Sequence, residues 1–587
     1  MSLSRHVEPE DIVHHLQDFR LPSQSDSSGN GQSSHLTPFS TPYTSQRDIP
    51  KYQIPQSGAP GDTVYEMLKD ELDLDGRPNL NLASFVDTYL EDNAQRLMVE
   101  NVGKNLADND EYPALLSISN RCVSIIAHLW DVQKGEKAVG SPTVGSSEAV
   151  HLGGLAMKRR WQEKRRAQGK DTAKPNIIMG ANAQVALLKF ARYFEVEARI
   201  LPVSEKSNFC LDPELVKKSV DENTIGMFVI LGSTYTGHYE PVETISKILD
   251  EFQEKTGADI PIHVDAASGG FVAPFTYAKT GGSKWNFELP RVVSINCSGH
   301  KYGLVTPGLG WIIWRDQSYL SKDLIFELHY LGGTEESYTL NFSRPGAQVV
   351  VQYYNLIHLG FDGYREVMEN CLANARILSK SLEATGWYTC LSDIHRPAPI
   401  NHAAQAAGAA AADVSAHVKG AVTGKSAKQS QQPEPETSAS YVAGLPVVSF
   451  RFTDEFRREY PHIKQETVSL LMRARQWIIP NYALPPGEDE TEILRVVIRV
   501  SMSFDLLDRL VTDLVQVTET LMENDEVDLS ILQKQHKKGP VKKEEEEEEG
   551  EEEKKQEGRL KKGEDEAMRL GREVKKRMAD GIHRSVC

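Results

Sequence analysis

Between residues 176 and 314, short apolar runs of strand length alternate with longer stretches in which apolar residues recur at helical spacing. The expected strands lie at residues 177–179, 227–231, 260–264, 292–295 and 311–314, and the expected helices between them at 183–194 and 242–256. This rhythm predicts an α/β layer with a mainly parallel sheet flanked by helices. In such sheets, ligands bind in the crevice beyond the carboxyl ends of the strands.

Composition distinguishes the segment that forms this α/β layer from polar segments at both ends of the sequence. Residues 1–62 are expected to form a flexible N-terminal arm, because most of this segment is rich in Ser, Pro, Gly, Gln and Thr. We expect a large domain over residues 63–362 and a smaller α/β C-terminal domain over 363–530, with a low-complexity insertion at 398–444. Residues 531–587 alternate acidic and basic blocks and are expected to be a charged, disordered tail.

Charge and cysteine usage exclude several classes of protein. The formal net charge of −17 argues against a nucleic-acid partner, which requires a basic surface. The six cysteines include no C-x-x-C pair, so we assign no metal site and no disulfide framework. The N-terminus lacks the apolar region of a signal peptide, and no apolar run approaches the roughly 18 residues that span a bilayer. We therefore expect a soluble, cytoplasmic protein with no membrane partner.

Two polar motifs follow expected strands. Asp265 lies in HVDAASGG and Lys301 in SGHKYG, each directly after an apolar run. Taken alone, the aspartate is more often a turn or helix cap and the lysine more often a surface residue. Together at one sheet edge they suit a cofactor whose aldehyde is held by the amine and whose pyridine nitrogen is kept protonated by the acid.

A third motif suggests an anion site. Ser146 and Ser147 precede the apolar stretch 149–157, and the basic residues 158–160 follow it. Free N–H groups and hydroxyls at a helix N-terminus bind phosphate, and basic residues near the C-terminus complement the helix dipole. Taken by itself, the motif is better explained by an ordinary serine cap.

The runs VGSSEA, HVDAASGGFVAPF, SINCSGHKYGL, YLGG and NFSRPGAQVV resemble the glutamate decarboxylases among the group II pyridoxal-phosphate-dependent decarboxylases. FARYFEVEAR, DENTIGM and TYTGHYEP are similar to glutamate decarboxylases in particular, and the likeness covers residues 64–522 apart from the insertion. The resemblance implies the α/β architecture of fold-type I pyridoxal-phosphate enzymes, pyridoxal 5'-phosphate as cofactor, and a homodimer or larger homo-oligomer.

The resemblance also implies roles for individual residues. Lys301 would carry the cofactor, Asp265 would pair with its pyridine nitrogen, and His300 would act beside them. The remaining cofactor contacts would be Ser146, Ser147, Gln184, Thr234, Ala267, Ser298 and, from the neighbouring subunit, Ser343. His300 would share the phosphate with the serines, although a histidine at this position could be purely structural or could exchange protons.

Four residues match the family's substrate contacts. Ser84, Asn105 and Asp108 would bind the side-chain carboxylate, and Arg495 would bind the α-carboxylate. Without the family, Asn105 and Asp108 would be assigned to a solvated helix end or loop. Arg495 and Arg499 share one strand face at their spacing, and the spacing does not say which of them is structural.

The implied activity is removal of the α-carboxyl group of L-glutamate, which gives 4-aminobutanoate (GABA) and carbon dioxide. Aspartate or cysteine sulfinate is an alternative substrate, and a non-catalytic scaffold is a more distant alternative. Plant relatives end in a calmodulin-binding helix with a tryptophan anchor, whereas no tryptophan follows Trp477 here. Calmodulin is therefore not an expected partner, although residues 569–577 are basic and partly apolar.

Overall fold

The computed structural model describes residues 52–56, 58–108, 110–277, 283–328, 335–398 and 437–523. The chain divides into two units, Met1–Pro78 and Asn79–Cys587. In the first unit, helix α2 (Gly61–Leu72) is the long described element. Most of the expected arm, most of the insertion and the whole expected tail lie outside the described residues.

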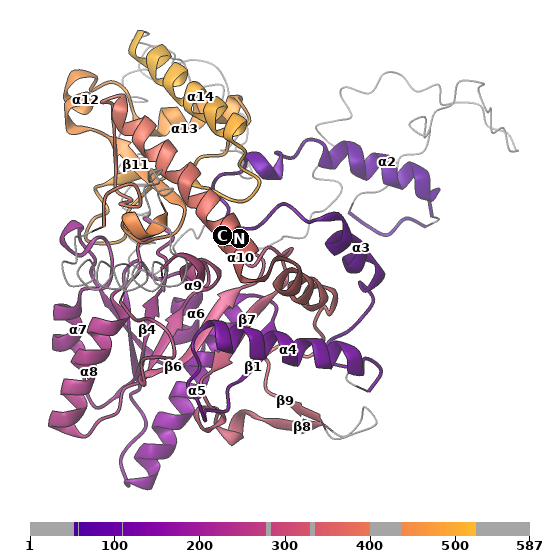
Figure 1. Ribbon diagram of the computed structural model, residues 1–587, viewed down its shortest axis with the longest axis vertical. Helices are drawn as coiled ribbons and strands as arrows, with labels where there is room; N and C mark the ends of the chain where they lie inside the picture. Colours follow the sequence, from indigo (N-terminus) through magenta and orange to yellow (C-terminus); the bar gives the residue numbers. More distant parts are fainter. Residues whose placement is uncertain are drawn as a thin grey trace, which may run out of the picture. The chain divides into compact units, whose positions relative to one another are not determined.

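A seven-stranded sheet forms the centre of the second unit (Figure 1), with the strand order β1-β7-β6-β5-β4-β2-β3. The strands are β1 (Val139–Thr143), β2 (Asn176–Gly180), β3 (Glu197–Leu201), β4 (Thr224–Ile230), β5 (Ile262–Asp265), β6 (Val292–Ser298) and β7 (Gly310–Trp314). Strands β2 to β6 are parallel, and β7 runs antiparallel to both of its neighbours. The predicted mainly parallel sheet is confirmed.

Helices cover both faces of this sheet. Helices α5 (Ser146–Ala167) and α6 (Val185–Tyr193) bury Met157 and Phe190 with Phe228 of β4 on one face. On the other face lie α4 (Pro113–Leu129), α8 (Val242–Thr256) and α10 (Ala347–Ala384).

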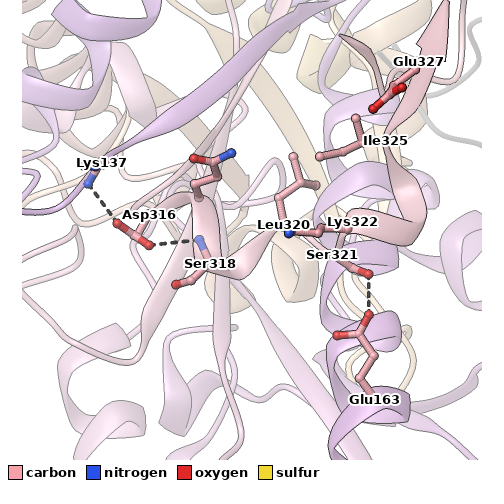
Figure 2. Close-up of a pocket in the computed structure, with 10 residues that line it drawn as sticks. Lys137, Glu163, Asp316, Ser318, Leu320, Ser321, Lys322, Ile325 and Glu327 are labelled. Carbon is pink, nitrogen blue, oxygen red and sulfur yellow. Dashed lines mark hydrogen bonds between the residues drawn. The ribbon is translucent and has the colours of Figure 1, made fainter.

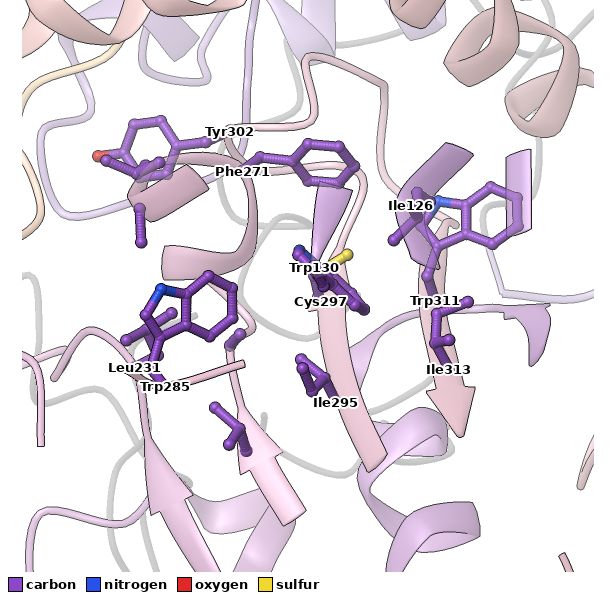
Figure 3. Packing of buried hydrophobic residues seen from close by; sticks show 14 of the residues in the cluster. Ile126, Trp130, Leu231, Phe271, Trp285, Ile295, Cys297, Tyr302, Trp311 and Ile313 are labelled. Atoms are coloured by element: carbon purple, nitrogen blue, oxygen red, sulfur yellow. The ribbon is translucent and has the colours of Figure 1, made fainter. Parts of the chain in front are cut away.

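Strands β6 and β7 contribute to the core on this second face through alternate residues. Figure 3 shows Ile295, Cys297, Trp311 and Ile313 gathered with Ile126 of α4. Alternation along a strand leaves the intervening residues of β6 for the face under α5. That division places Ser294, Asn296 and Ser298 on the α5 side.

A smaller antiparallel sheet has the order β10-β11-β13-β12. Its strands are β10 (Tyr388–Cys390), β11 (Val447–Phe452), β12 (Asn481–Ala483) and β13 (Glu492–Val497). Helices α13 (Gln465–Ala474) and α14 (Phe504–Glu523) share a core with this sheet (Figure 1). The short apolar runs at 387–391, 447–452 and 494–500 predict three of these strands from sequence, and the structure confirms them to within a few residues.

Helix α10 crosses the expected domain boundary at 362/363 and is interrupted at Gly360, whose φ of 60° is in the left-handed region that favours glycine. The boundary itself stays a prediction. Apart from short 3-10 helices, the other described elements are α3 (Asp92–Glu100), α7 (Pro213–Ser219), α9 (Ala273–Thr276), α12 (Asp454–Glu459) and the antiparallel pair β8 (Phe326–Leu328) and β9 (Glu335–Ser337). None of the helices in the described ranges combines the length and apolar character that a bilayer span requires.

Candidate active site

The expected cofactor residues gather at the carboxyl edge of the central sheet. Asp265 is the last residue of β5, and Ser298 is the last residue of β6. Gln184 and Thr234 follow the ends of β2 and β4, and Ser146 opens α5 shortly after β1 ends. Parallel strands bring these ends to one edge, so residues far apart in sequence meet there.

Lys301 and Asp265 are both held by short loops at this edge. Lys301 Nζ donates a hydrogen bond to Ser268 Oγ at 3.2 Å and lies 5.2 Å from the centre of the Phe85 ring. The backbone N–H of Ser298 donates to Ala267 O at 3.1 Å, which ties the loop after β5 to the end of β6. The loop that carries Asp265 is thus joined to the strand that leads to Lys301.

The Asp265 side chain is buried and anchored at one oxygen. Its Oδ1 accepts hydrogen bonds from the backbone N–H of Ala267 at 3.1 Å and from Asn296 Nδ2 at 3.0 Å. Within the part of the chain that the structure describes, both hydrogen bonds of this carboxylate end on Oδ1. Oδ2 is therefore the oxygen left for a ligand at the sheet edge.

The hydroxyl groups of Ser146 and Ser298 lie 2.6 Å apart, at the N-terminus of α5. Gly310 of β7 permits this approach, because a Cβ at that position would lie 2.7 Å from the backbone nitrogen of Ser146. Ser147 is exposed beside them. Two hydroxyls and a helix N-terminus form a site suited to a phosphate group.

His300 lies against the same turn. Its Nδ1 donates to Leu309 O at 2.8 Å when that nitrogen carries the proton, and a Cβ on Gly145 would lie 3.5 Å from its Cε1. Burial, followed by the charge of Lys301, lowers the pKa of His300 to about 4. The ring is therefore neutral near pH 7, with Nε2 as its proton acceptor.

Gln184, Thr234 and Arg495 form a connected group. Gln184 Nε2 donates to Thr234 Oγ1 at 2.8 Å, and Arg495 Nη1 donates to the carbonyl oxygen of Thr234 at 2.8 Å. Arg495 Nη2 donates to the carbonyl oxygen of Ala83. The small sheet thereby contributes Arg495 of β13 to the site on the large sheet.

Arg495 is buried, and among the described residues no carboxylate lies within ion-pair distance of it. A buried charge without a counter-ion is costly, so an anionic ligand would stabilise it. Arg499 has a different environment: its guanidinium donates to the carbonyl oxygens of Val86 and Asn81 and attracts the carboxylate of Asp87. This contrast favours Arg495 for a ligand and Arg499 for a structural role.

Asn105 and Ser343 form a second group. Asn105 Nδ2 donates to Ser343 Oγ at 3.4 Å, and Asn105 Oδ1 accepts from the backbone N–H of Arg344 at 3.1 Å. Asp108 accepts from the N–H of Glu111 in the turn before α4. Ser84 has a local partner, since its Oγ accepts from the N–H of Val86 at 3.1 Å.

A hollow of about 880 Å³ lies elsewhere on the molecule (Figure 2). Its lining includes Asp316, which follows the end of β7 that pairs with Ser294 rather than with Ser298. The hollow is therefore at the opposite edge of the sheet from Lys301. Asp316 accepts from the N–H groups of Lys137 and Ser318, and Glu163 accepts from Ser321, so both carboxylates have partners.

The residues at the carboxyl edge fit pyridoxal phosphate. The cofactor presents an aldehyde, a pyridine nitrogen and a phosphate, and the edge offers an amine, a buried carboxylate and a hydroxyl-lined helix N-terminus. The close approach at Gly310 is specific to the phosphate end, because a side chain there would fill the space that Ser146 occupies. The donor set matches all three groups.

Several residues at this site have no assigned role in the sequence analysis. Ser268 and Phe85 contact Lys301, Tyr482 lies 5.5 Å from the Arg495 guanidinium, and Asn296 binds Asp265. Asn296 has a signal in the sequence, because Ser294, Asn296 and Ser298 alternate with apolar residues in a run that reads as a buried strand. Phe85 and Tyr482 have no such signal, since they reach the site from distant segments.

Comparison with known proteins agrees with this geometry. The family described as "Pyridoxal-dependent decarboxylase conserved domain" matches residues 62–398. The chain is 45% identical over 530 residues to a glutamate decarboxylase of Saccharomyces cerevisiae (strain ATCC 204508 / S288c), covering 87% of this chain and 86% of that protein. It is 43% identical over 475 residues to a glutamate decarboxylase of Petunia hybrida, covering 81% and 84% of the two chains.

Among solved structures, a glutamate decarboxylase of Lactobacillus brevis CGMCC 1306 aligns with a TM-score of 0.71 and 34% identity, over 83% of this chain and 98% of that chain. Fold and edge chemistry thus define a pyridoxal-phosphate enzyme of the α/β class. The chain belongs to the pyridoxal-dependent decarboxylase family.

Proposed function

We propose that this protein removes the α-carboxyl group of L-glutamate and releases carbon dioxide and 4-aminobutanoate (GABA). The observation that carries the proposal is the meeting of Lys301 and Asp265 at one sheet edge, in a chain 45% identical to a glutamate decarboxylase. A non-catalytic scaffold would have no need, at this edge, of a buried carboxylate and of a buried arginine that has no carboxylate partner among the described residues.

Pyridoxal phosphate, when bound, supplies a ring that accepts the electron pair left by the departing carboxylate. Lys301 would hold the cofactor through its Nζ amine, the group that can bond to the aldehyde carbon. Asp265 keeps the proton on the pyridine nitrogen, so that the ring can accept charge. Ser146, Ser147 and Ser298 hold the phosphate, and His300 lies beside them.

The protein decides which bond breaks by orienting the substrate. Arg495 binds the α-carboxylate, Thr234 and Gln184 hold the ring, and Ala267 lies against it. By holding both the α-carboxylate and the ring, these residues would select the bond between Cα and the carboxylate for cleavage. The carboxylate would leave as carbon dioxide, and a proton from water would take its place on Cα.

We infer that the active site is shared between two subunits of a homodimer. Ser343 completes the phosphate site of the partner, and Asn105 and Asp108, with Ser84, bind the side-chain carboxylate. The contact between Asn105 and Ser343 supports this grouping, since both would cross the interface together. Val99, Val102 and Leu340 are exposed in the adjoining sequence, 67%, 73% and 48% respectively, as at a surface that a partner covers.

We further infer a cytoplasmic location. The five cysteines of the described ranges are free and buried, as expected for a protein kept in a reducing compartment. We infer that the large domain over 63–362 and the small domain over 363–530 both contribute to the substrate site, the small one through Arg495 of β13.

Two measurements test the proposal. Borohydride reduction of the loaded enzyme followed by peptide mapping should place the cofactor on Lys301 and on no other lysine. Carbon dioxide release from glutamate, aspartate and cysteine sulfinate, measured side by side, should be fastest with glutamate. A preference for aspartate or cysteine sulfinate would keep the reaction type and overturn the substrate.

A further inference from the structure

Four polar side chains form a compact group on the face of the central sheet that α5 covers. His263 and Asp265 lie two residues apart on β5, and Ser294 and Asn296 lie two residues apart on β6. The register pairs His263 with Ser294 and Asp265 with Asn296, so all four side chains point to the same face. Each is at most 4% exposed, in a sheet that is otherwise largely apolar on this face.

The hydrogen bonds within this group all have the same donor-to-acceptor order, from Ser294 through His263 and Asn296 to Asp265. A carboxylate only accepts, so Asn296 must turn its NH₂ group toward Asp265 Oδ1, at 3.0 Å. Asn296 Oδ1 then faces His263 Nε2 at 2.7 Å, which requires the proton on Nε2. Burial lowers the pKa of His263 to about 4, so the ring is neutral and Nδ1 accepts from the Ser294 hydroxyl at 2.7 Å.

We propose that this chain of Ser294, His263 and Asn296, called here the relay, positions Asp265 for the pyridine nitrogen of the cofactor. The terminal torsion of an aspartate is soft, and the relay together with the Ala267 N–H fixes Oδ1 so that Oδ2 is presented to the ring. The three residues act through Asp265 and are positioning residues. The inference rests on the proposed role of Asp265.

Helix α5 has a glycine, Gly153, where it packs against His263 of the relay. A Cβ on Gly153 would lie 2.5 Å from His263 Nδ1, whereas a Cβ on the next residue, Gly154, would lie 2.4 Å from Cε2 of Phe190. Both glycines are buried in the same helix. The imidazole therefore occupies the space that a side chain at residue 153 would need, and α5 links the phosphate serines at its start to the relay two turns further on.

The first test compares two fully buried asparagines of the same sheet. Asn176 binds Asp221 and Thr224 at 2.9 and 2.8 Å and has no contact with the relay, so Asn176→Ala is the control for Asn296→Ala. The measurements are the Kd of pyridoxal phosphate, by titration of the cofactor-free protein, and the unfolding midpoint of that protein. Asn296→Ala should raise the Kd about tenfold, as loss of a hydrogen bond to a charged group predicts, while Asn176→Ala changes only the midpoint.

The second test uses the adjacent glycines and leaves every relay residue in place. Gly153→Ala and Gly154→Ala introduce the same methyl group with nearly the same overlap, against His263 in one variant and Phe190 in the other. Both should lower the unfolding midpoint. Only Gly153→Ala should also raise the Kd for pyridoxal phosphate and change the pH dependence of the absorption spectrum of the bound cofactor.

Asp265→Asn distinguishes a failure of the relay from a failure of the proposed role of Asp265. If Asp265→Asn weakens cofactor binding while Asn296→Ala and Gly153→Ala bind as tightly as their controls, the relay is overturned and the proposed function stands. If Asp265→Asn binds the cofactor like the wild type with an unchanged spectrum, the role of Asp265 itself is wrong. Failure of Asn296→Ala to fold leaves the glycine pair to decide.

Discussion

At the scale of single residues, the site depends on one amine that no neighbour can replace. Lys301 is held by Ser268 and Phe85 beside the Asp265 loop, and only a primary amine can bind the cofactor's aldehyde covalently. We expect Lys301→Ala to reduce carbon dioxide release by roughly a thousandfold or more. Lys322→Ala, at the distant hollow, is the matched control and should behave as the wild type.

Arg495 gives a second prediction at this scale. Arg495→Lys keeps the charge but loses the planar fork that donates to Thr234 and Ala83 and that suits a carboxylate. We expect kcat/KM for glutamate to fall by about ten- to a hundredfold. Arg499→Lys, whose partners are the carbonyls of Val86 and Asn81, should mainly lower the unfolding midpoint. Equal effects on KM from both variants would contradict the assignment.

At the scale of elements, the N-terminus of α5 and the end of β7 must lie unusually close together. Gly310→Ala would place a methyl carbon 2.7 Å from the Ser146 nitrogen and push the helix away from Ser298. We expect the Kd for pyridoxal phosphate to rise about tenfold, since the helix N-terminus and both hydroxyls share the phosphate. Gly61→Ala, at an exposed position with no atom within 4 Å of the added carbon, should leave this Kd unchanged.

The elements that sequence patterns predict best are those with an unambiguous pattern. Strands β5 and β6 are fully buried runs whose apolar residues mark them as strands, and they lie within a few residues of their predicted positions. Strand β3 is missed because it is short and half-exposed at the sheet edge: Glu197 and Ile200 are exposed, and Leu201 is its one buried residue. The antiparallel direction of β7 is also unpredictable, because an apolar run carries no sign of its direction.

The same limit applies to the site. Residues that follow a strand can be placed at one edge by topology alone, which explains why Asp265 and Lys301 could be expected together. Ser298 and Thr234 are expected only from the family resemblance. Phe85 and Tyr482 reach Arg495 from segments whose approach depends on how the small sheet packs. No local pattern encodes that packing.

At the scale of the whole molecule, a shared active site makes activity a property of the dimer. Lys301→Ala and Asn105→Ala should each be inactive alone, because each damages a different subunit's contribution to the same site. Mixed subunits should recover about a quarter of wild-type activity, since half of the dimers are hybrids with one intact site of two. Complete absence of recovery after subunit exchange would contradict a shared site.

The stability of the cofactor-free protein should also depend on pH through His263. Its pKa is lowered to about 4 by burial, against about 6.5 in an unfolded chain, so between these values the unfolded state binds the extra proton. Stability from this residue is therefore complete above pH 6.5 and is lost as the pH falls toward 4, by up to about 3 kcal/mol.

Other buried groups oppose this trend. Burial raises the pKa of Asp87 to about 6 and that of Glu240 to about 7, so their contributions weaken the fold as the pH rises. Asp87 and Glu240 are expected to titrate alike in the wild type and in a His263→Gln variant. The difference in unfolding free energy between wild type and variant therefore isolates the contribution of the histidine. Urea titrations from pH 7.5 to 4.5 should show this difference largest at high pH and shrinking with acid. A difference that stays constant across the range would mean that the histidine titrates in the fold as it does in the unfolded chain, and the neutral ring that the direction of the relay requires would then be wrong.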